Sequence, residues 1–208
     1  MNTNQFTTER INNFTDAIFA IAITLLILDV KVPAADLIEE KGAVSALLQN
    51  QTPQIIGLVV SFFVAALFWK AHLTLAKNIS SYDSKLIWLN TLLLFFVVIM
   101  PFSTAFYSRN FGYDSAFFFY CINVACIGII NFLMISHTIK KENLGDRFSL
   151  IDLNWMKQRS LIVPIVFMLS VLISYQSSLL GRLTFVLIFF LQSLGDNMVK
   201  RKLAKKAT

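Results

Sequence analysis

From Arg10 to Asp29 the chain reads RINNFTDAIFAIAITLLILD, an apolar run with polar side chains at both ends. Its apolar core, Ala17–Leu28, would rise only about 18 Å as an α-helix, whereas the hydrocarbon core of a bilayer is about 30 Å thick. If the segment spans a membrane, polar residues such as Asn13 and Asp16 enter the membrane's thickness, where they are stable only when they face protein or water. The segment is therefore predicted to be a helix that is buried among other helices or lines a water path.

Five further apolar segments follow the first one, and together the six decide the fold class. Hydrophobic residues make up 56% of the 208 residues and charged residues only 14%, whereas a soluble domain has about 25% charged residues. The segments approach the length of a spanning helix, and none alternates like a strand of a β-barrel. We expect an all-α integral membrane protein that forms one domain over residues 1–208. Its six transmembrane helices are predicted over roughly 8–30, 54–77, 84–107, 115–140, 158–176 and 179–198.

The loops between these segments alternate in charge. One side of the membrane would carry 14 Lys and Arg side chains, including those of both termini, and the other side only 4. By the positive-inside rule, both termini are predicted to lie in the cytoplasm, in a multi-pass protein of the plasma membrane. Glu9 and Asp16 flank the first segment, which argues against a cleaved signal peptide because the leading flank of a signal peptide is basic. The basic tail is expected to anchor on anionic lipids.

One face of the first helix is defined on an ideal helical wheel by four residues, Ala17, Ile21, Thr24 and Leu28. Leu25 lies about 40° from Ile21, at the edge of this face, and Asp16 lies about 140° away and is expected to point into its own subunit. Arg10 falls close to the direction of Ile21. Whether Arg10 faces outward there or turns into the subunit through tilt or a bend stays open. Apolar residues at this spacing are most often core or lipid contacts.

Polar residues of the second and third segments could satisfy those of the first. His72 closes the second segment, and the third runs from Asp83 past Asn90, all in the same membrane layer as Arg10 and Asp16. A buried arginine is tolerated where carboxylates and amides satisfy it. The hypothesis is a network that locks the first three helices together, formed by Arg10, Asp16, His72, Asp83 and Asn90. The alternative is that His72 and Asp83 are only interfacial and solvated.

Several motifs stand out in the first half of the chain. They are Arg10-x-x-x-Phe14-Thr15-Asp16, Trp69-x-x-His72, Asp83-x-x-Leu86-x-Trp88-Leu89-Asn90 and Pro101-Phe102-x-Thr104. Together these motifs resemble the bacterial branch of the lysosomal potassium channel family named for transmembrane protein 175. The family carries Ser where this chain has Thr15, and both side chains bear a hydroxyl. The likeness is close over the first half of the chain, whereas the second half agrees mainly in helix count.

The resemblance implies an assembly and a pore. Bacterial members are tetramers in which the first helix of each subunit lines a central pore, so a homotetramer is expected here. They lack the Thr-Val-Gly-Tyr-Gly filter of ordinary potassium channels, and that string is absent from these 208 residues. Bulky apolar side chains narrow the path instead. By position, Ile21 would form the hydrophobic constriction, Thr24 a polar ring and Leu28 an outer apolar ring, with Ala17 and Leu25 beside them.

The resemblance also assigns a structural signature, made of Arg10, Phe14, Thr15 and Asp16 with His72, Asp83 and Asn90 as partners. The expected function is a passive potassium-selective cation channel, whose partners are the permeant potassium ion, the lipid bilayer and further copies of the chain. An apolar ring can gate by dewetting, and Thr24 hydroxyls would offset part of the cost of ion dehydration. Asp29 would either concentrate cations near the outer mouth or be a solvated carboxylate at a helix end. A secondary transporter and a cation or proton leak pathway are the alternatives.

Other classes of protein find no support in the sequence. It contains no Gly-x-Ser-x-Gly, His-Glu-x-x-His or phosphate-loop motif, so neither enzymatic activity nor a cofactor is expected, and no metal beyond permeant potassium. The net charge of +6 does not indicate a nucleic-acid partner, because the cations flank apolar segments and form no stripe with aromatic residues.

Overall fold

The computed structural model describes residues 8–141 and 150–207, and this part of the chain is helical and contains no strand. The helices in chain order are α1 (Thr8–Leu25), the 3-10 turn η1 (Leu26–Asp29), α2 (Ala35–Lys41), α3 (Ala43–Ala76), α4 (Ser84–Arg109), α5 (Asp114–Lys141), α6 (Leu150–Ser174), α7 (Ser178–Leu183) and α8 (Val186–Ala207). The prediction of an all-α fold is confirmed.

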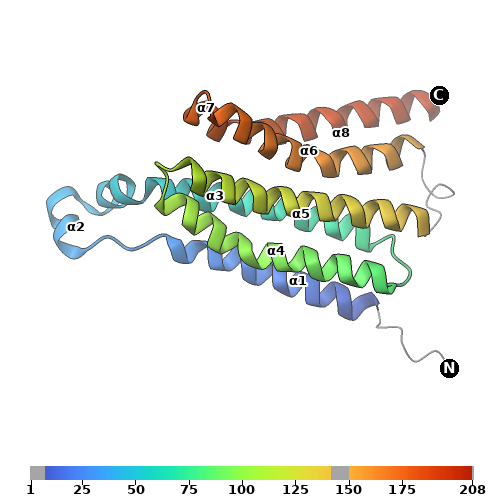
Figure 1. The fold of residues 1–208 in the computed structure, drawn as a ribbon, viewed down its shortest axis with the longest axis horizontal. Coiled ribbons are helices and arrows are strands. Elements are labelled where there is room, and N and C mark those ends of the chain that lie inside the picture. The colour runs from blue at the N-terminus through green and yellow to red at the C-terminus, as the bar shows by residue number, and fades with distance from the viewer. Residues whose placement is uncertain (1–7, 142–149, 208) are drawn as a thin grey trace.

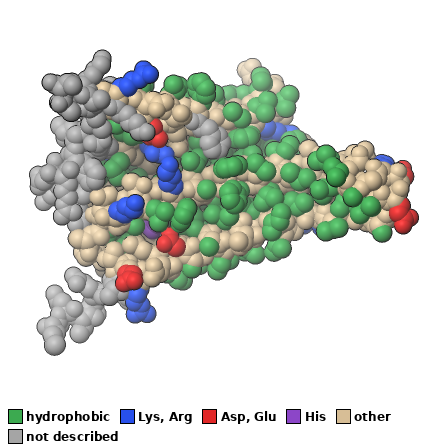
Figure 2. All heavy atoms as spheres, turned by 180° about the vertical axis from the view of Figure 1, so that it is seen from behind, with side chains coloured by type: hydrophobic (Ala, Val, Ile, Leu, Met, Phe, Trp, Pro, Cys, Tyr) green, Lys and Arg blue, Asp and Glu red, His purple; other side chains and the backbone are tan. Residues whose placement is uncertain are grey.

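Six helical segments in the described ranges are long and apolar enough to cross a membrane, which confirms the predicted number. They are Thr8–Asp29, Gln51–Ala76, Ser84–Arg109, Asp114–Lys141, Asn154–Ser174 and Ser178–Val199. Hydrophobic side chains cover the middle of the molecule on the face shown in Figure 2, and most charged side chains lie toward its two ends. This distribution matches a bilayer, whose hydrocarbon core disfavours charge.

The long helices run side by side, with α5 between α4 and α6 (Figure 1). Helix α5 supplies much of the core, including Cys121, Val124, Ile127 and Met134, whose side chains are fully buried. Of its most apolar stretch, 61% is buried inside the subunit, whereas for α1 the share is 22%. Helix α1 therefore lies at the edge of the subunit, packed on α4 and α3.

The two ends of the bundle differ. The starts of α1 and α4 and the ends of α3, α5 and α8 share one end, and α2 projects beyond the other (Figure 1). The chain reverses between α2 and α3 at Gly42, whose φ of 79° lies in the region that favours glycine. Asp36, Glu39 and Glu40 on α2 place negative charge at the projecting end.

The observed helices depart from the predicted ranges in several places: α6 begins at Leu150 and not near residue 158, α8 runs to Ala207, and two further differences concern α3 and the last predicted helix. Helix α3 begins at Ala43, whereas the predicted helix began near residue 54. The first turns of α3 are helical but too polar to belong to the membrane span, so hydropathy did not locate them. The last predicted helix is divided into α7 and α8. At the break the backbone N–H groups of Thr184, Leu187 and Ile188 donate to carbonyls three residues back, which is the tighter 3-10 pattern.

Candidate functional site

Helix α1 has one face that packs inside the subunit. Thr15, Phe19, Ala22 and Leu26 on this face are at most 4% exposed. Their spacing of four, three and four residues keeps them on one side of an α-helix, turned toward α3 and α4. The Phe19 ring lies 6.4 Å from the His72 ring of α3, measured between centroids. This face fixes the rotation of α1 about its own axis.

The opposite face of α1 and its continuation in η1 carry all five residues that were predicted for the pore: Ala17, Ile21, Thr24 and Leu25 on α1 and Leu28 on η1. All are exposed, Ile21 to 55% and Leu28 to 70%. The Thr24 hydroxyl donates to the Ile21 carbonyl over 2.8 Å, so an oxygen with free lone pairs lies close to the apolar side chains. None of the five belongs to the core cluster of the described residues, so they are open to lipid, to water or to a second copy.

The signature residues of α1 divide between the two faces. Thr15 is fully buried and accepts a hydrogen bond from Asn90 Nδ2 of α4 over 2.9 Å. Its own hydroxyl donates to the Ile11 carbonyl, so Thr15 links the backbone of α1 to α4. Phe14 is 61% exposed, and Arg10 is exposed as well. Thr15 therefore holds α1 to the subunit, whereas Phe14 and Arg10 lie outside its core.

Asp16 points to α3, where Trp69 Nε1 donates to its Oδ1 over 2.9 Å. The half-buried Asp16 side chain thus points toward its own subunit, in the direction that the helical wheel indicated. A second contact of the same kind joins Asn12 to Tyr82, whose hydroxyl donates over 2.7 Å. Burial, followed by the charge of Asp16, raises the pKa of Tyr82 to about 12, so the phenol keeps its proton at neutral pH. Sequence reasoning missed the pair of Asn12 and Tyr82, because an amide and a phenol so far apart in the chain give no pattern.

The predicted network of five residues is divided into separate contacts. Asp83 does not reach Arg10; its Oδ1 accepts from the backbone N–H of Leu86 and caps α4, and its Oδ2 lies 2.8 Å from His137 Nε2 of α5. Partial burial acts to raise the pKa of Asp83, but the hydrogen bonds from His137 and Leu86 outweigh burial and lower it. The cap fixes the direction of the carboxylate, which is why it faces α5 and not α1.

Arg10 and His72 also differ from the expectation. In the described part of the chain Arg10 makes no hydrogen bond and no ion pair, since it lies on the exposed side of α1. His72 is 1% exposed, so it is not a solvated interfacial residue, and neither ring nitrogen has a hydrogen-bond partner among the described residues. The two side chains therefore do not meet within the subunit.

Asp29 ends η1 and is 8% exposed. Ser108 Oγ donates to its Oδ2, and Arg109 Nε lies 2.5 Å from its Oδ1, both from the end of α4. The view of Asp29 as a solvated carboxylate is therefore wrong. Its charge is balanced by Arg109, which also reduces any attraction it exerts on cations. This contact ties the far end of α1 to α4.

Metal-binding groups do not gather in residues 8–141 and 150–207: no three His, Cys, Asp or Glu side chains lie close enough there to hold an ion. On the exposed face of α1 the Thr24 hydroxyl is one oxygen with free lone pairs.

Comparison with known proteins is consistent with this site. Residues 10–101 match the family described as endosomal/lysosomal potassium channel TMEM175. A protein of Streptomyces collinus named potassium channel is 39% identical over 107 residues, which are 51% of this chain and 50% of that protein. The bovine protein named endosomal/lysosomal proton channel TMEM175 is 38% identical over 98 residues, 45% of this chain and 20% of that protein. The chain thus spans about half the length of the bacterial relative and a fifth of the mammalian one.

The fold agrees over a greater length. The crystal structure of a lysosomal potassium-selective channel TMEM175 homolog from Chamaesiphon minutus matches with a TM-score of 0.76 and 26% identity. The match covers 90% of this chain and 97% of that one. The likeness in fold therefore extends through α5 to α8, beyond the half in which the sequences align closely.

Proposed function

Because this chain belongs, through its N-terminal half, to the TMEM175 family of endosomal/lysosomal potassium channels, we propose that it is a passive, potassium-selective cation channel. Several copies, four in the simplest arrangement, surround a central pore lined by α1. Ile21 forms its narrowest apolar ring, with Thr24 and Leu28 further along the path and Ala17 and Leu25 at its sides. The pore uses these rings in place of a Thr-Val-Gly-Tyr-Gly filter.

The observation that carries this proposal is the exposed face of α1. The segment Thr8–Asp29 is long and apolar enough to span a membrane, yet Arg10, Asn13 and Thr24 are exposed on it. A lipid-facing arginine or asparagine at such depth is costly, so this face is better suited to water or to another copy of the chain. The other five spans keep more of their apolar stretch inside the subunit than α1 does.

A hydrophobic ring supports selectivity only when dehydration is partly compensated. Ile21 and Leu28 supply apolar surface, and the Thr24 hydroxyl between them supplies an acceptor oxygen. Potassium sheds its hydration shell more readily than sodium, so a narrow path with weak oxygen ligands favours potassium. The polar contacts of Thr15 and Asp16 set the rotation of α1 and so decide which side chains face the pore.

Proton conduction is the second candidate, since the mammalian relatives that align with the N-terminal half are named proton channels. A coupled secondary transporter is the remaining alternative. Reconstitution separates the three. Liposomes that hold the protein and a potassium gradient should release potassium when a protonophore balances the charge, and single-channel steps should appear in planar bilayers. Proton flux with valinomycin but no potassium conductance would favour the second candidate, and saturating, stoichiometric flux would favour a transporter.

Both termini are proposed to be cytoplasmic in the plasma membrane. The starts of α1 and α4 and the ends of α3, α5 and α8 share one end of the bundle, and the sequence places 14 of its 18 Lys and Arg residues in the loops and termini of that side. Reporters that are active only in the cytoplasm, fused to each terminus in turn, test this orientation. Activity at one terminus alone would contradict it.

A further inference from the structure

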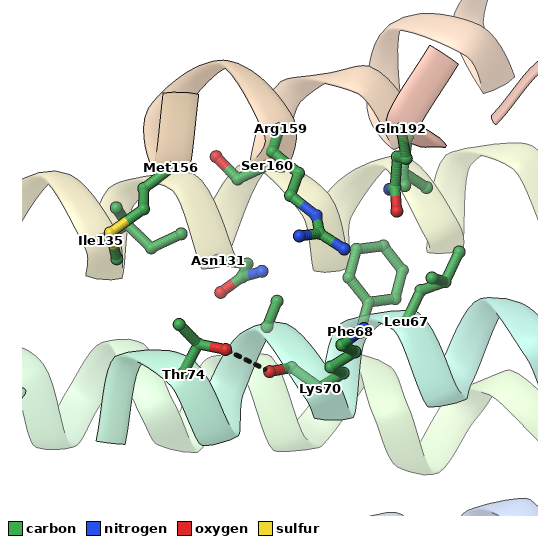
Figure 3. A pocket seen from close by; sticks show the side chains of 12 residues that line it. Leu67, Phe68, Lys70, Thr74, Asn131, Ile135, Met156, Arg159, Ser160 and Gln192 are labelled. Carbon is green, nitrogen blue, oxygen red and sulfur yellow. Dashed lines mark hydrogen bonds between the residues drawn. The ribbon is translucent and has the colours of Figure 1, made fainter. Parts of the chain in front are cut away.

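A cavity of about 70 Å³ lies between α3, α5, α6 and α8, away from the exposed face of α1. Figure 3 shows the Arg159 guanidinium reaching into it from α6, the Gln192 amide from α8 and the Asn131 amide from α5. Lys70 and Thr74 of α3 form the opposite wall. About 10–15 Å³ of such space admits one water molecule, so the cavity has room for a group with several oxygens.

The charge of the cavity is positive. Lys70 is exposed and has no ion-pair partner in the described part of the chain. Arg159 Nη1 donates to Asp196 Oδ1 over 3.2 Å, and the same oxygen accepts from Trp155 Nε1 over 2.9 Å. A guanidinium has five N–H groups, so this one contact leaves most of its donors free. Two cations against one carboxylate disfavour a bound cation and favour an anion.

The buried amides supply the second, independent observation. Asn131 is 2% exposed, and its Oδ1 has no hydrogen-bond partner among the described residues. Gln192 is 7% exposed and borders the same cavity, although its amide atoms are not fully buried. Buried amides are rarely left without partners, since each lost hydrogen bond costs stability. Both amides are aimed into the cavity, so a ligand there would satisfy them (Figure 3).

The remaining wall is apolar. Leu67 and Phe68 of α3 and Met156 and Val163 of α6 line the same cavity, and both helices belong to membrane spans. Thr74 and Ser160 already donate their hydroxyl hydrogens to the carbonyls of Lys70 and Lys157, so they can serve only as acceptors there. The donors that remain are the two cationic side chains and the amides, which converge from four helices.

We propose that this cavity binds the phosphate group of an anionic ligand, with Arg159 and Lys70 supplying charge and Gln192 and Asn131 supplying amide hydrogen bonds. A ligand hydroxyl beside the phosphate could in turn donate to Asn131 Oδ1. The phosphate belongs either to a membrane lipid, whose chains would follow the apolar wall, or to a soluble phosphate compound. Basic pockets between transmembrane helices are used for anionic lipid head groups in other membrane proteins. The proposal does not depend on ion conduction.

The test measures the thermal unfolding midpoint of the purified full chain in neutral detergent. One arm adds phosphatidylglycerol, with phosphatidylcholine of the same chains as reference, and the other adds inorganic phosphate. Either phosphatidylglycerol or phosphate is expected to raise the midpoint in a saturable way, and whichever does so identifies the source. Lys70→Gln should raise the half-saturating concentration about tenfold, the usual loss for one hydrogen bond to a charged group.

The matched control is Lys85→Gln, which removes the same charge from an exposed residue at the start of α4. It should leave the response unchanged. Arg159→Gln is expected to weaken binding as well, but it also removes the contact with Asp196. If Arg159→Gln folds poorly, the comparison of Lys70→Gln with Lys85→Gln decides whether the cavity binds phosphate. No response to either compound, or equal responses from Lys70→Gln and Lys85→Gln, would overturn the proposal.

Discussion

Phe19 and Ile21 lie on opposite faces of α1: Phe19 is 1% exposed and packs beside His72, whereas Ile21 is 55% exposed. This relationship separates the residues that hold the helix from those that we propose to meet the ion. Substitutions on the first face should therefore change stability, and substitutions on the second should change ion flux. The predictions below use this distinction.

Ile21→Asn should raise the leak of cations severalfold and weaken the preference for potassium over sodium. Asparagine is polar and smaller than isoleucine, so it widens the ring, keeps it wetted and removes the dewetting barrier. Efflux of each ion from proteoliposomes measures both effects. The control is Ile122→Asn on α5, where the isoleucine is 56% exposed. If Ile21→Asn and Ile122→Asn behave alike, Ile21 does not line the pore.

Thr24→Ala should reduce the preference for potassium while conduction persists. The substitution removes the acceptor oxygen that lies beside Ile21, and sodium and potassium then differ less in how their dehydration is compensated. Reversal potentials under bi-ionic conditions measure the change. Thr24→Ser restores a hydroxyl and should restore selectivity. Selectivity that survives in Thr24→Ala would assign the discrimination to other rings.

Thr15→Val should lower the free energy of unfolding by about 1–3 kcal/mol, because Asn90 Nδ2 then loses its acceptor in a buried place. Thr91→Val is the matched control. Thr91 is exposed, and its hydroxyl makes the same contact to the carbonyl four residues back, here Ile87, that Thr15 makes to Ile11. Unfolding in detergent measures both variants, and equal losses would show that the bond to Asn90 contributes nothing.

Asp29 and Arg109 should show a coupling energy of about 0.5–3 kcal/mol in a double-mutant cycle of Asp29→Asn and Arg109→Gln. Arg109 is about half exposed, so the lower part of that range is expected. Because Arg109 already balances its charge, Asp29→Asn should change stability more than cation conductance. A large fall in conductance with unchanged stability would instead support a cation-concentrating role for Asp29.

The lowered pKa of Asp83 predicts a dependence of stability on pH. A carboxyl whose pKa is lower in the folded state stabilises the fold above its ordinary value, and the contribution is lost as the pH falls through the lowered value. Asp83→Asn should therefore flatten the acid side of the stability profile. Asp36→Asn, at an exposed carboxylate on α2, should leave the profile unchanged. An unaltered acid limb in Asp83→Asn would contradict the prediction.

The sequence predicted the spans and the face of α1 that carries Ile21 for a physical reason. A bilayer requires continuous apolar helices, so hydropathy locates them, and the period of an α-helix places Ile21 opposite Phe19. Hydropathy does not mark where a helix ends outside the membrane, and α3 accordingly begins earlier than predicted, at Ala43. The break between α7 and α8 likewise depends on packing and backbone bonds that composition does not show.

The sequence placed the polar residues in one layer of the membrane but could not predict which of them pair. His72, Arg10 and His137 are all expected in the same membrane layer as Asp83. Composition alone does not say which of them Asp83 contacts. The choice depends on its role as the cap of α4, which turns the carboxylate toward His137 on α5. Asp29 is a similar case, because its partner Arg109 is separated from it by 80 residues and is brought near only by the packing of α1 on α4.

The most direct measurement is a map of the assembled particle in the presence of caesium, a heavy congener of potassium. The proposed function predicts α1 of every copy around the symmetry axis, a continuous passage along that axis, and caesium density next to the ring of Ile21 or the Thr24 hydroxyls. A map with α1 at the lipid-facing periphery and no passage along the axis would contradict the proposal that α1 lines the pore.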